Sequence, residues 1–279
     1  TDQYNTNKDL NDFKMFDNEV FKYRSYQKML YGPWGIPDID RLAPLKINKP
    51  VITPPAKINQ EKAADAIIGS IFASAVLDMI GVGVEFLTNG VTKGLLVGNP
   101  DITWSHPRCN DHNERFVRGT PTDDTSQTIL IMRSIVEANY SGKKGKICVD
   151  GVNIDPVDFG KKLVDWIYNG HQEHKHKGGL GCGATTFSVI KHPLYKSDPI
   201  KAAYEVWDQT GRRVAPNGSV MRIASSGAFA FWDENVVIQN ASYYARVTHA
   251  DPRCVFSSIG AALLIARYIQ WNSGFIDNE

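Results

Sequence analysis

From Glu61 onward, apolar residues recur at the spacing of an amphipathic α-helix, and this periodicity constrains the fold more than any other feature of the chain. The first stretch places Ala64, Ile67, Ile68, Ile71, Phe72, Ala75 and Val76 at helical positions. Similar stretches predict helices over 123–139, 156–170, 183–191, 199–208, 218–231, 235–247 and 252–270. Alternation at the period of a β-strand is hard to find. The sequence therefore predicts an all-α, compact multi-helix domain over residues 61–279, with negligible strand content.

Residues 1–60 have a different composition and are predicted to form an irregular N-terminal extension. They are rich in Asn, Asp, Lys and Tyr, and then in Pro. Because proline lacks an N–H and restricts the residue before it, an extended conformation is expected, with a short helix near 17–30. Two interpretations stay open, namely an arm that lies on the domain, anchored by aromatic residues such as Tyr31 and Trp34, and a disordered leader.

Composition narrows the classes of partner. The formal net charge of the 279 residues is +1, which gives no electrostatic argument for binding nucleic acid. The chain has no uninterrupted apolar run of membrane-spanning length and its first twenty residues are polar, so neither a membrane span nor a signal peptide is expected. Four widely spaced cysteines favour a reducing, intracellular compartment, cytoplasmic or nuclear. A monomer is expected.

Two acidic segments carry the strongest chemical signal. In Pro121–Ser126, Asp123 and Asp124 stand between two threonines, directly before a predicted helix. One such residue suffices for an N-cap, whereas this density of hard oxygen atoms also suits Mg²⁺. The second segment places Asp78 and Glu85 on either side of a glycine-rich turn, where a helix C-cap with surface carboxylates is the alternative interpretation.

Three further segments could line a ligand cleft. The loop Gly178–Thr185 contains four glycines before a predicted helix, an arrangement that can present N–H groups to phosphate but that also occurs in linkers. The stretch Pro216–Arg222 contains an Asn-Gly turn, and a Thr-His pair follows at Thr248 and His249. Irregular histidine clusters at 106–112 and 171–176 match zinc sites poorly and favour solvated loops.

In this order, the five segments resemble those of the ADP-ribosylglycohydrolases over about residues 61–270. Asp78, Gly81 and Glu85 keep the spacing of the first motif of that family, and Thr122-Asp123-Asp124-Thr125 matches its Thr-Asp/Glu-Asp-Thr motif. The resemblance implies a hydrolase that removes ADP-ribose from modified proteins or related compounds with the help of two Mg²⁺ ions.

The resemblance also implies roles for particular residues. It assigns metal binding to Thr122, Asp123 and Asp124, and catalysis to Glu85 together with the two aspartates. It assigns substrate contacts to Asp78, Gly179, Gly181, Cys182, Gly183, Asn217 and His249. Cleavage at the anomeric carbon would pass through an oxocarbenium-like state, with Mg²⁺ positioning the sugar and a carboxylate moving the proton.

Two departures from the family pattern modify this expectation. Leu77 stands where the family prefers Gly, and no Gly-x-Asp-x-Asp-Thr motif follows residue 125. We therefore expect the domain to lack its C-terminal part and the second metal site to be incomplete. The alternative function is a non-catalytic ADP-ribose-binding module. A third interpretation is a structural protein on the same fold, but the retained acidic residues argue against it.

Overall fold

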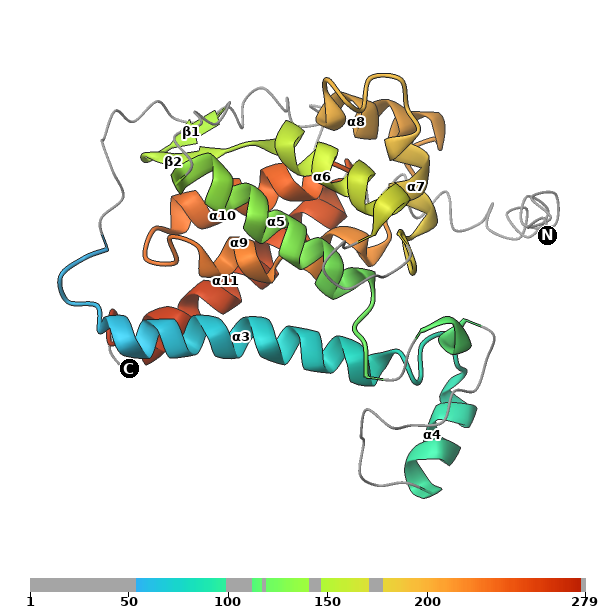
Figure 1. The fold of residues 1–279 in the computed structure, drawn as a ribbon, viewed down its shortest axis with the longest axis horizontal. Helices are drawn as coiled ribbons and strands as arrows, with labels where there is room; N and C mark the ends of the chain where they lie inside the picture. The colour runs from blue at the N-terminus through green and yellow to red at the C-terminus, as the bar shows by residue number, and fades with distance from the viewer. Residues whose placement is uncertain (1–53, 99–111, 117–118, 141–146, 171–177, 277–279) are drawn as a thin grey trace, which may run out of the picture. The chain divides into compact units, whose positions relative to one another are not determined.

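The computed structural model describes residues 54–98, 112–116, 119–140, 147–170 and 178–276 (Figure 1). The chain divides into two compact units, Thr1–Leu45 and Lys46–Glu279, and the first lies wholly outside the described residues. So do the helix predicted near 17–30 and every histidine of the two clusters except His112.

Helices make up most of the described chain, in the order α3 (Gln60–Gly81), α4 (Asn89–Gly98), η4 (Asn113–Arg115), α5 (Asp123–Tyr140), α6 (Pro156–Asn169), α7 (Ala184–Ile190), α8 (Pro199–Gln209), η6 (Asn217–Arg222), α9 (Ala224–Ala228), α10 (Glu234–Arg246) and α11 (Pro252–Asn272). A short antiparallel hairpin of β1 (Ile147–Val149) and β2 (Val152–Ile154) separates α5 from α6, with Ile147 opposite Ile154. The predicted all-α class is confirmed, and the hairpin is a small addition to it.

Local sequence explains where most helices begin. The side chains of Asn59, Asp155, Asp198, Asp233 and Asp251 each accept a backbone N–H in the first turn of the helix that follows. Proline occupies the first turn of α6, α8 and α11, where its missing N–H has no helical partner to lose. These caps account for the agreement between predicted and observed helix starts.

The prediction of a single helix over 218–231 is wrong. The chain instead forms the 3₁₀ helix η6, bends at Ile223 and continues as the short helix α9. Arg222, at the end of η6, is fully buried, whereas α9 lies against α11 so closely that a Cβ on Gly227 would come 2.5 Å from the carbonyl oxygen of Ala262. One straight helix could not serve both contacts.

The core lies around α10 and α11, which pack on each other and on α9, while α5 packs against α6 and α9 (Figure 1). Its fully buried members include Ile131, Phe159, Leu163, Val236, Tyr244 and Ile269. α3 runs along the outside of this group and contacts α11, α9 and α5. α5 therefore starts beside the end of α3 and continues into the core, an arrangement that positions the acidic residues.

Two described helices, α3 and α11, are long and apolar enough to cross a membrane when length and composition alone are considered. Core helices of soluble proteins pass the same test, and α11 is packed within the domain. α3 is covered much less.

Candidate active site

The two acidic motifs meet where α3 ends and α5 begins. Asp78 accepts hydrogen bonds from the backbone N–H of Thr122 at 2.9 Å and of Thr125 at 3.1 Å. It also accepts a bond of 2.7 Å from each of the two threonine hydroxyls. The carboxylate of Asp78 thus connects the end of one helix to the start of the other through both threonines of the Thr-Asp-Asp-Thr segment.

Asp123 and Asp124 lie in the first turn of α5 and are crowded by other carboxylates. Asp123 is 7 % exposed, and burial together with the charges of Asp124, Asp78 and Glu85 raises its pKa to about 8. Burial and the charges of Asp78 and Glu85 raise the pKa of Asp124 to about 6. The raised pKa values mean that these carboxylates are more stable when one of them holds a proton or when a cation is bound beside them.

Glu85 lies in the turn after α3 and is hydrogen-bonded to His112, whose Nε2 is 2.9 Å from Oε2 of Glu85. The imidazole ring packs edge-on against Phe86, at a centroid distance of 4.8 Å, and also against Phe116. Phe86 has a φ of 60°, a conformation that non-glycine residues rarely adopt. Sequence reasoning did not identify His112 as a site residue, because nothing in the sequence connects it with Glu85, 27 positions earlier.

The glycine loop lies against Asp123. Gly181 has a φ of 88°, and a Cβ at this position would come 2.5 Å from Oδ1 of Asp123, so a side chain is excluded both by backbone conformation and by space. Next to it, the thiol of Cys182 has its pKa raised to about 12 by burial and by the charge of Asp123. Cys182 is therefore a neutral thiol, unsuited to act as a nucleophile.

A chain of buried hydrogen bonds leads away from the acidic residues. The side-chain amide of Gln127 donates to Asp123 at 3.1 Å and its carbonyl accepts from Arg222 at 2.7 Å. Arg222 also donates to the hydroxyl of Thr248 at 2.7 Å and to the carbonyl oxygen of Tyr244 at 3.0 Å. Because Arg222 is fully buried, these bonds fix the relative positions of α5, η6 and α10.

The last residue in this series of buried hydrogen bonds is His249, which is 3 % exposed. Thr248 Oγ1 is 2.7 Å from His249 Nδ1, and burial with the nearby charge of Arg222 lowers the pKa of His249 to about 3. The ring is therefore neutral. Since Thr248 already accepts from Arg222, its hydroxyl proton is directed to Nδ1, which favours the tautomer that carries its proton on Nε2. His249 then offers one N–H donor.

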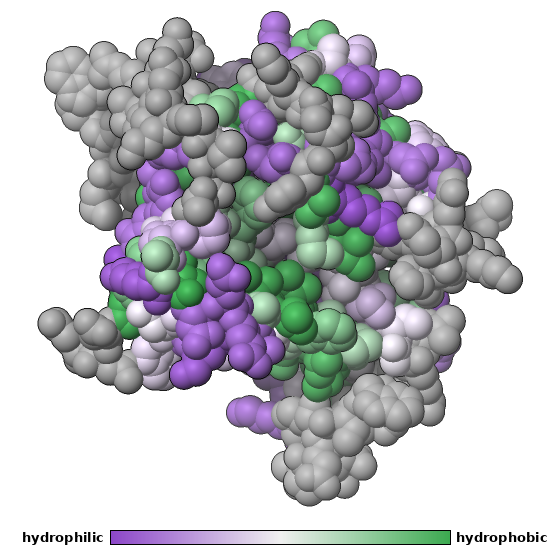
Figure 2. Space-filling model, turned by 60° about the vertical axis from the view of Figure 1, so that its left-hand side comes forward, coloured by the Kyte–Doolittle hydropathy of each residue, from purple (hydrophilic) through white to green (hydrophobic). Residues whose placement is uncertain are grey.

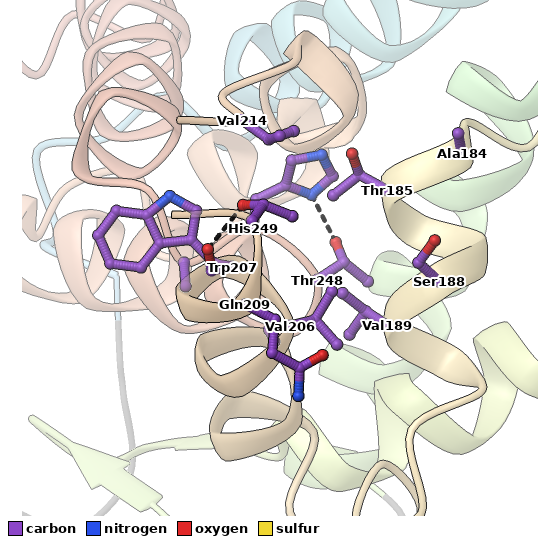
Figure 3. Close-up of a pocket in the computed structure, with 13 residues that line it drawn as sticks. Ala184, Thr185, Ser188, Val189, Val206, Trp207, Gln209, Val214, Thr248 and His249 are labelled. Carbon is purple, nitrogen blue, oxygen red and sulfur yellow. Dashed lines mark hydrogen bonds between the residues drawn. The ribbon is translucent and has the colours of Figure 1, made fainter. Parts of the chain in front are cut away.

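His249 lies in the wall of a pocket of about 480 Å³ (Figure 3). The other walls come from α7, α8 and Val214, and are mainly apolar, with hydroxyls of Thr185 and Ser188 among them. Trp207 is held in place by a 3.1 Å hydrogen bond from its indole N–H to Asp251. A pocket of this size and lining is typical of sites for small organic ligands.

Asn217, the exposed first residue of η6, follows Pro216 and precedes a tightly constrained glycine. A Cβ on Gly218 would come 2.8 Å from Cε1 and 2.9 Å from Nε2 of His249. The Asn-Gly turn and the Thr-His pair, which are 31 positions apart in the sequence, therefore touch.

The carboxylate and hydroxyl oxygens at the start of α5 are of the type that Mg²⁺ prefers, and their unbalanced negative charge favours a cation. Within the described ranges, however, no three or more His, Cys, Asp or Glu side chains are grouped so that they could hold a metal ion. Thr122, Asp123 and Asp124 would thus supply part of one coordination shell, and water molecules would complete it.

Comparison with known proteins bears on this arrangement. The family model described as ADP-ribosylglycohydrolase matches residues 59–278. The chain belongs to the ADP-ribosylglycohydrolase family. An uncharacterized protein of Archaeoglobus fulgidus is 25% identical over 207 residues, which are 74% of this chain and 55% of that protein, so the chain spans about half the length of the curated relative it matches. No solved structure matches the chain.

Membership in the ADP-ribosylglycohydrolase family supports a function of the glycohydrolase type. The roles of individual residues, the requirement for Mg²⁺ and the substrate remain predictions.

Proposed function

We propose that this ADP-ribosylglycohydrolase removes ADP-ribose from modified proteins or related ADP-ribosyl compounds by Mg²⁺-assisted hydrolysis of the glycosidic bond. The observation that carries the proposal is the meeting of four separate segments: Asp78 at the end of α3, the Thr-Asp-Asp-Thr turn, Glu85 in its hydrogen bond with His112, and the glycine loop against Asp123. A stabilising role alone requires neither the exposed Glu85 carboxylate nor the repulsion between Asp123 and Asp124.

The substrate would extend from the acidic residues to the pocket beside α7. The reacting ribose would lie near Glu85 and Asp123, with the diphosphate along the loop Gly179–Gly183. The adenosine would reach the pocket of Figure 3, where His249 Nε2 and the hydroxyls of Thr185 and Ser188 would meet its polar atoms. Asn217 would line the cleft at the turn that touches His249.

Thr122, Asp123 and Asp124 would hold the Mg²⁺. The ion would supply a positive charge that orients the ribose hydroxyls and stabilises charge at the reacting centre. Asp78 would act indirectly, because its carboxylate is occupied by four hydrogen bonds to Thr122 and Thr125.

Hydrolysis adds the oxygen of one water to the anomeric carbon while the bond from that carbon to the side-chain atom of the modified residue breaks. One proton leaves the water and one reaches the departing side chain, which yields free ADP-ribose and the unmodified residue. Glu85 would take the first proton, and its hydrogen bond with His112 would orient its carboxylate for this step.

The test combines turnover and binding. In Mg²⁺ buffer, release of ADP-ribose from ADP-ribosyl-serine and ADP-ribosyl-arginine peptides would be followed, and ADP-ribose binding would be measured by calorimetry. We expect slow turnover, because the chain supplies only part of a metal shell. Glu85→Gln and Asp124→Asn should reduce the rate at least about tenfold. Glu234→Gln is the matched control, since the carboxylate of Glu234 forms a surface ion pair with Arg267 and Glu234 does not line the pocket of Figure 3.

The second candidate is a non-catalytic ADP-ribose-binding module. It is favoured by the lack, within the described part of the chain, of any group of three or more His, Cys, Asp or Glu side chains that could hold a metal ion. Binding of ADP-ribose with no turnover on either peptide would select this function. Neither binding nor turnover would contradict both proposals.

A further inference from the structure

The side-chain amide of Gln127 is fixed in one orientation. Gln127 lies on α5, one turn after Asp123, and is fully buried. Its carbonyl oxygen accepts a hydrogen bond of 2.7 Å from Nη1 of Arg222, and its amide nitrogen donates to Oδ2 of Asp123 at 3.1 Å. Because a guanidinium group can only donate hydrogen bonds, the amide atom that faces Arg222 must be the oxygen. The amide nitrogen therefore faces Asp123.

Arg222 is held in this contact by its other bonds. Nη2 donates to the carbonyl oxygen of Tyr244 at 3.0 Å and to the hydroxyl of Thr248 at 2.7 Å. The guanidinium group also lies over the ring of Phe159, 5.0 Å from its centroid, and Arg222 is fully buried. A flipped amide would turn its N–H groups towards the guanidinium and its oxygen towards the carboxyl group, and would lose both buried hydrogen bonds. The core of the domain thus sets the orientation of the Gln127 amide.

The fixed amide makes the two oxygens of Asp123 unequal. Oδ2 accepts from Gln127, so a cation that bound this oxygen would compete with a buried donor. Oδ1 lies beside Gly181, where a Cβ would come 2.5 Å from it, and glycine leaves the space next to this oxygen free of a side chain. Asp123 therefore offers one oxygen to a cation more readily than two.

We propose that Gln127, held by Arg222, is a positioning residue that makes Asp123 a one-oxygen ligand and thereby favours Mg²⁺ over Ca²⁺ at the start of α5. The inference rests on the proposed function, which assigns metal binding to Thr122, Asp123 and Asp124. Mg²⁺ requires near-octahedral coordination by oxygens at about 2.1 Å, whereas Ca²⁺ accepts more oxygens at longer distances and often binds both oxygens of one carboxylate. A carboxylate restricted to one oxygen suits the smaller ion.

Calorimetric titration of the full chain with Mg²⁺ and, separately, with Ca²⁺ tests the proposal without a measurement of turnover. The wild-type chain should bind Mg²⁺ at least as tightly as Ca²⁺. Gln127→Met removes the donor to Asp123 at a similar side-chain size, and it should lower the ratio of Mg²⁺ affinity to Ca²⁺ affinity about tenfold. A merely structural role of Gln127 would not change this ratio, because a general loss of stability weakens the binding of both ions.

A second variant keeps the contact with Arg222. Gln127→Glu still offers an acceptor to the guanidinium group, so it is expected to fold, but it places an oxygen instead of an N–H group beside Asp123. The additional oxygen suits the larger coordination shell of Ca²⁺, and the affinity ratio should fall in this variant as well.

Gln270→Met is the matched control. Gln270 is also buried, and the substitution removes a hydrogen bond of 2.7 Å from its amide nitrogen to the carbonyl oxygen of Phe231. This residue lies near the start of α3, whereas the acidic residues lie at the end of that helix, so the affinity ratio should stay as in wild type. Circular dichroism of each variant checks that it is folded.

Three results would overturn the inference. The wild-type chain could bind Ca²⁺ more tightly than Mg²⁺, or the affinity ratio could be unchanged in the Gln127 variants. Either result would leave the proposed hydrolase activity standing, because that activity is judged by release of ADP-ribose. Absence of binding of both ions would overturn the inference together with the assignment of the metal ligands. A lower ratio in the Gln127 variants, with Gln270→Met unchanged, would support it whether or not the chain hydrolyses ADP-ribosyl peptides.

Discussion

Helices α3 and α10 reverse the usual relation between composition and burial. α10 contains Asn, Gln, Ser, Tyr and Arg, and yet most of it, including Asn240 and Arg246, is buried. α3 has no charged residue through twelve consecutive positions, 66–77, and only two polar ones, Ser70 and Ser74, and yet Phe72 and Leu77 are each 67 % exposed. Burial of the polar residues of α10 follows from their position between neighbouring helices and not from complete hydrogen bonding, since the side-chain amide of Asn240 and Nε of Arg246 have no hydrogen-bond partner among the described residues. Apolar side chains of α3 stay exposed where no described element covers them, and Figure 2 shows hydrophobic side chains gathered at the level of α3.

The same contrast extends to the candidate active site. Near α10, the polar groups of Arg222, Thr248 and His249 are joined by hydrogen bonds. Near α3, the carboxylates of Asp78, Glu85, Asp123 and Asp124 repel one another. We therefore expect the bonded groups near α10 to raise the free energy of unfolding. The repelling carboxylates near α3 should lower it, as is common for residues that serve catalysis.

The largest loss of stability is expected when the buried hydrogen bonds near α10 are removed. Arg222→Met removes the donor to Gln127, Tyr244 and Thr248 and leaves buried acceptors unpaired. The free energy of unfolding should fall by about 3 kcal/mol in urea denaturation. Arg267→Met, which removes only a surface ion pair with Glu234, should change it by less than about 1 kcal/mol. Equal losses would mean that the buried network does not stabilise the domain.

The pH dependence of His249 probes the same side. Its pKa of about 3 lies below the ordinary value of 6.5, so the unfolded chain takes up a proton between these values that the folded chain does not. This residue therefore lowers stability as the pH falls from 6.5 towards 3, by about 2 kcal/mol at pH 5. Relative to wild type, His249→Gln should gain that amount between pH 6.5 and pH 5. A constant difference across urea titrations at these pH values would contradict the lowered pKa.

Asp123 should show the opposite sign on the α3 side. Its pKa of about 8 lies above the ordinary 3.8, so in this range the folded chain holds a proton that the unfolded chain releases. The contribution to stability is complete below pH 3.8 and is lost as the pH rises to 8. In chelator-containing buffer, Asp123→Asn should therefore gain about 3 kcal/mol relative to wild type between pH 5 and pH 7. Added Mg²⁺ should reduce this gain if the carboxylate binds the ion.

The smallest effect is expected on the exposed apolar face of α3. Phe72→Ser should alter the free energy of unfolding by less than about 0.5 kcal/mol, because Phe72 is 67 % exposed. Val237→Ala, at a fully buried position of α10, should cost about 2 kcal/mol. A large loss from Phe72→Ser would show that part of the chain covers α3, and the contrast between the helices would then disappear.

Much of the helical fold followed from the sequence, because its signals are local. Asp155 and Pro156 predict the start of α6, and the apolar spacing from Ala64 to Val76 predicts α3. The break at Ile223 was missed, since it results from the packing of α9 against α11 and from the burial of Arg222. The exposure of the apolar side chains of α3 could not be predicted either, because the periodicity of one helix does not indicate which other elements pack against it.

For the site, the sequence by itself determined which oxygen-bearing residues and glycines are present and in what order. Only the tertiary structure decided that Asp78 bonds to Thr122 and Thr125, that His112 pairs with Glu85, and that Arg222 joins Gln127 to Thr248. Caps and helical spacing act within a few residues and can be read along the chain. Hydrogen bonds, burial and the pKa shifts that they cause depend on groups far apart in the sequence, such as Arg222 and Gln127, which are 95 positions apart and are brought together only by folding.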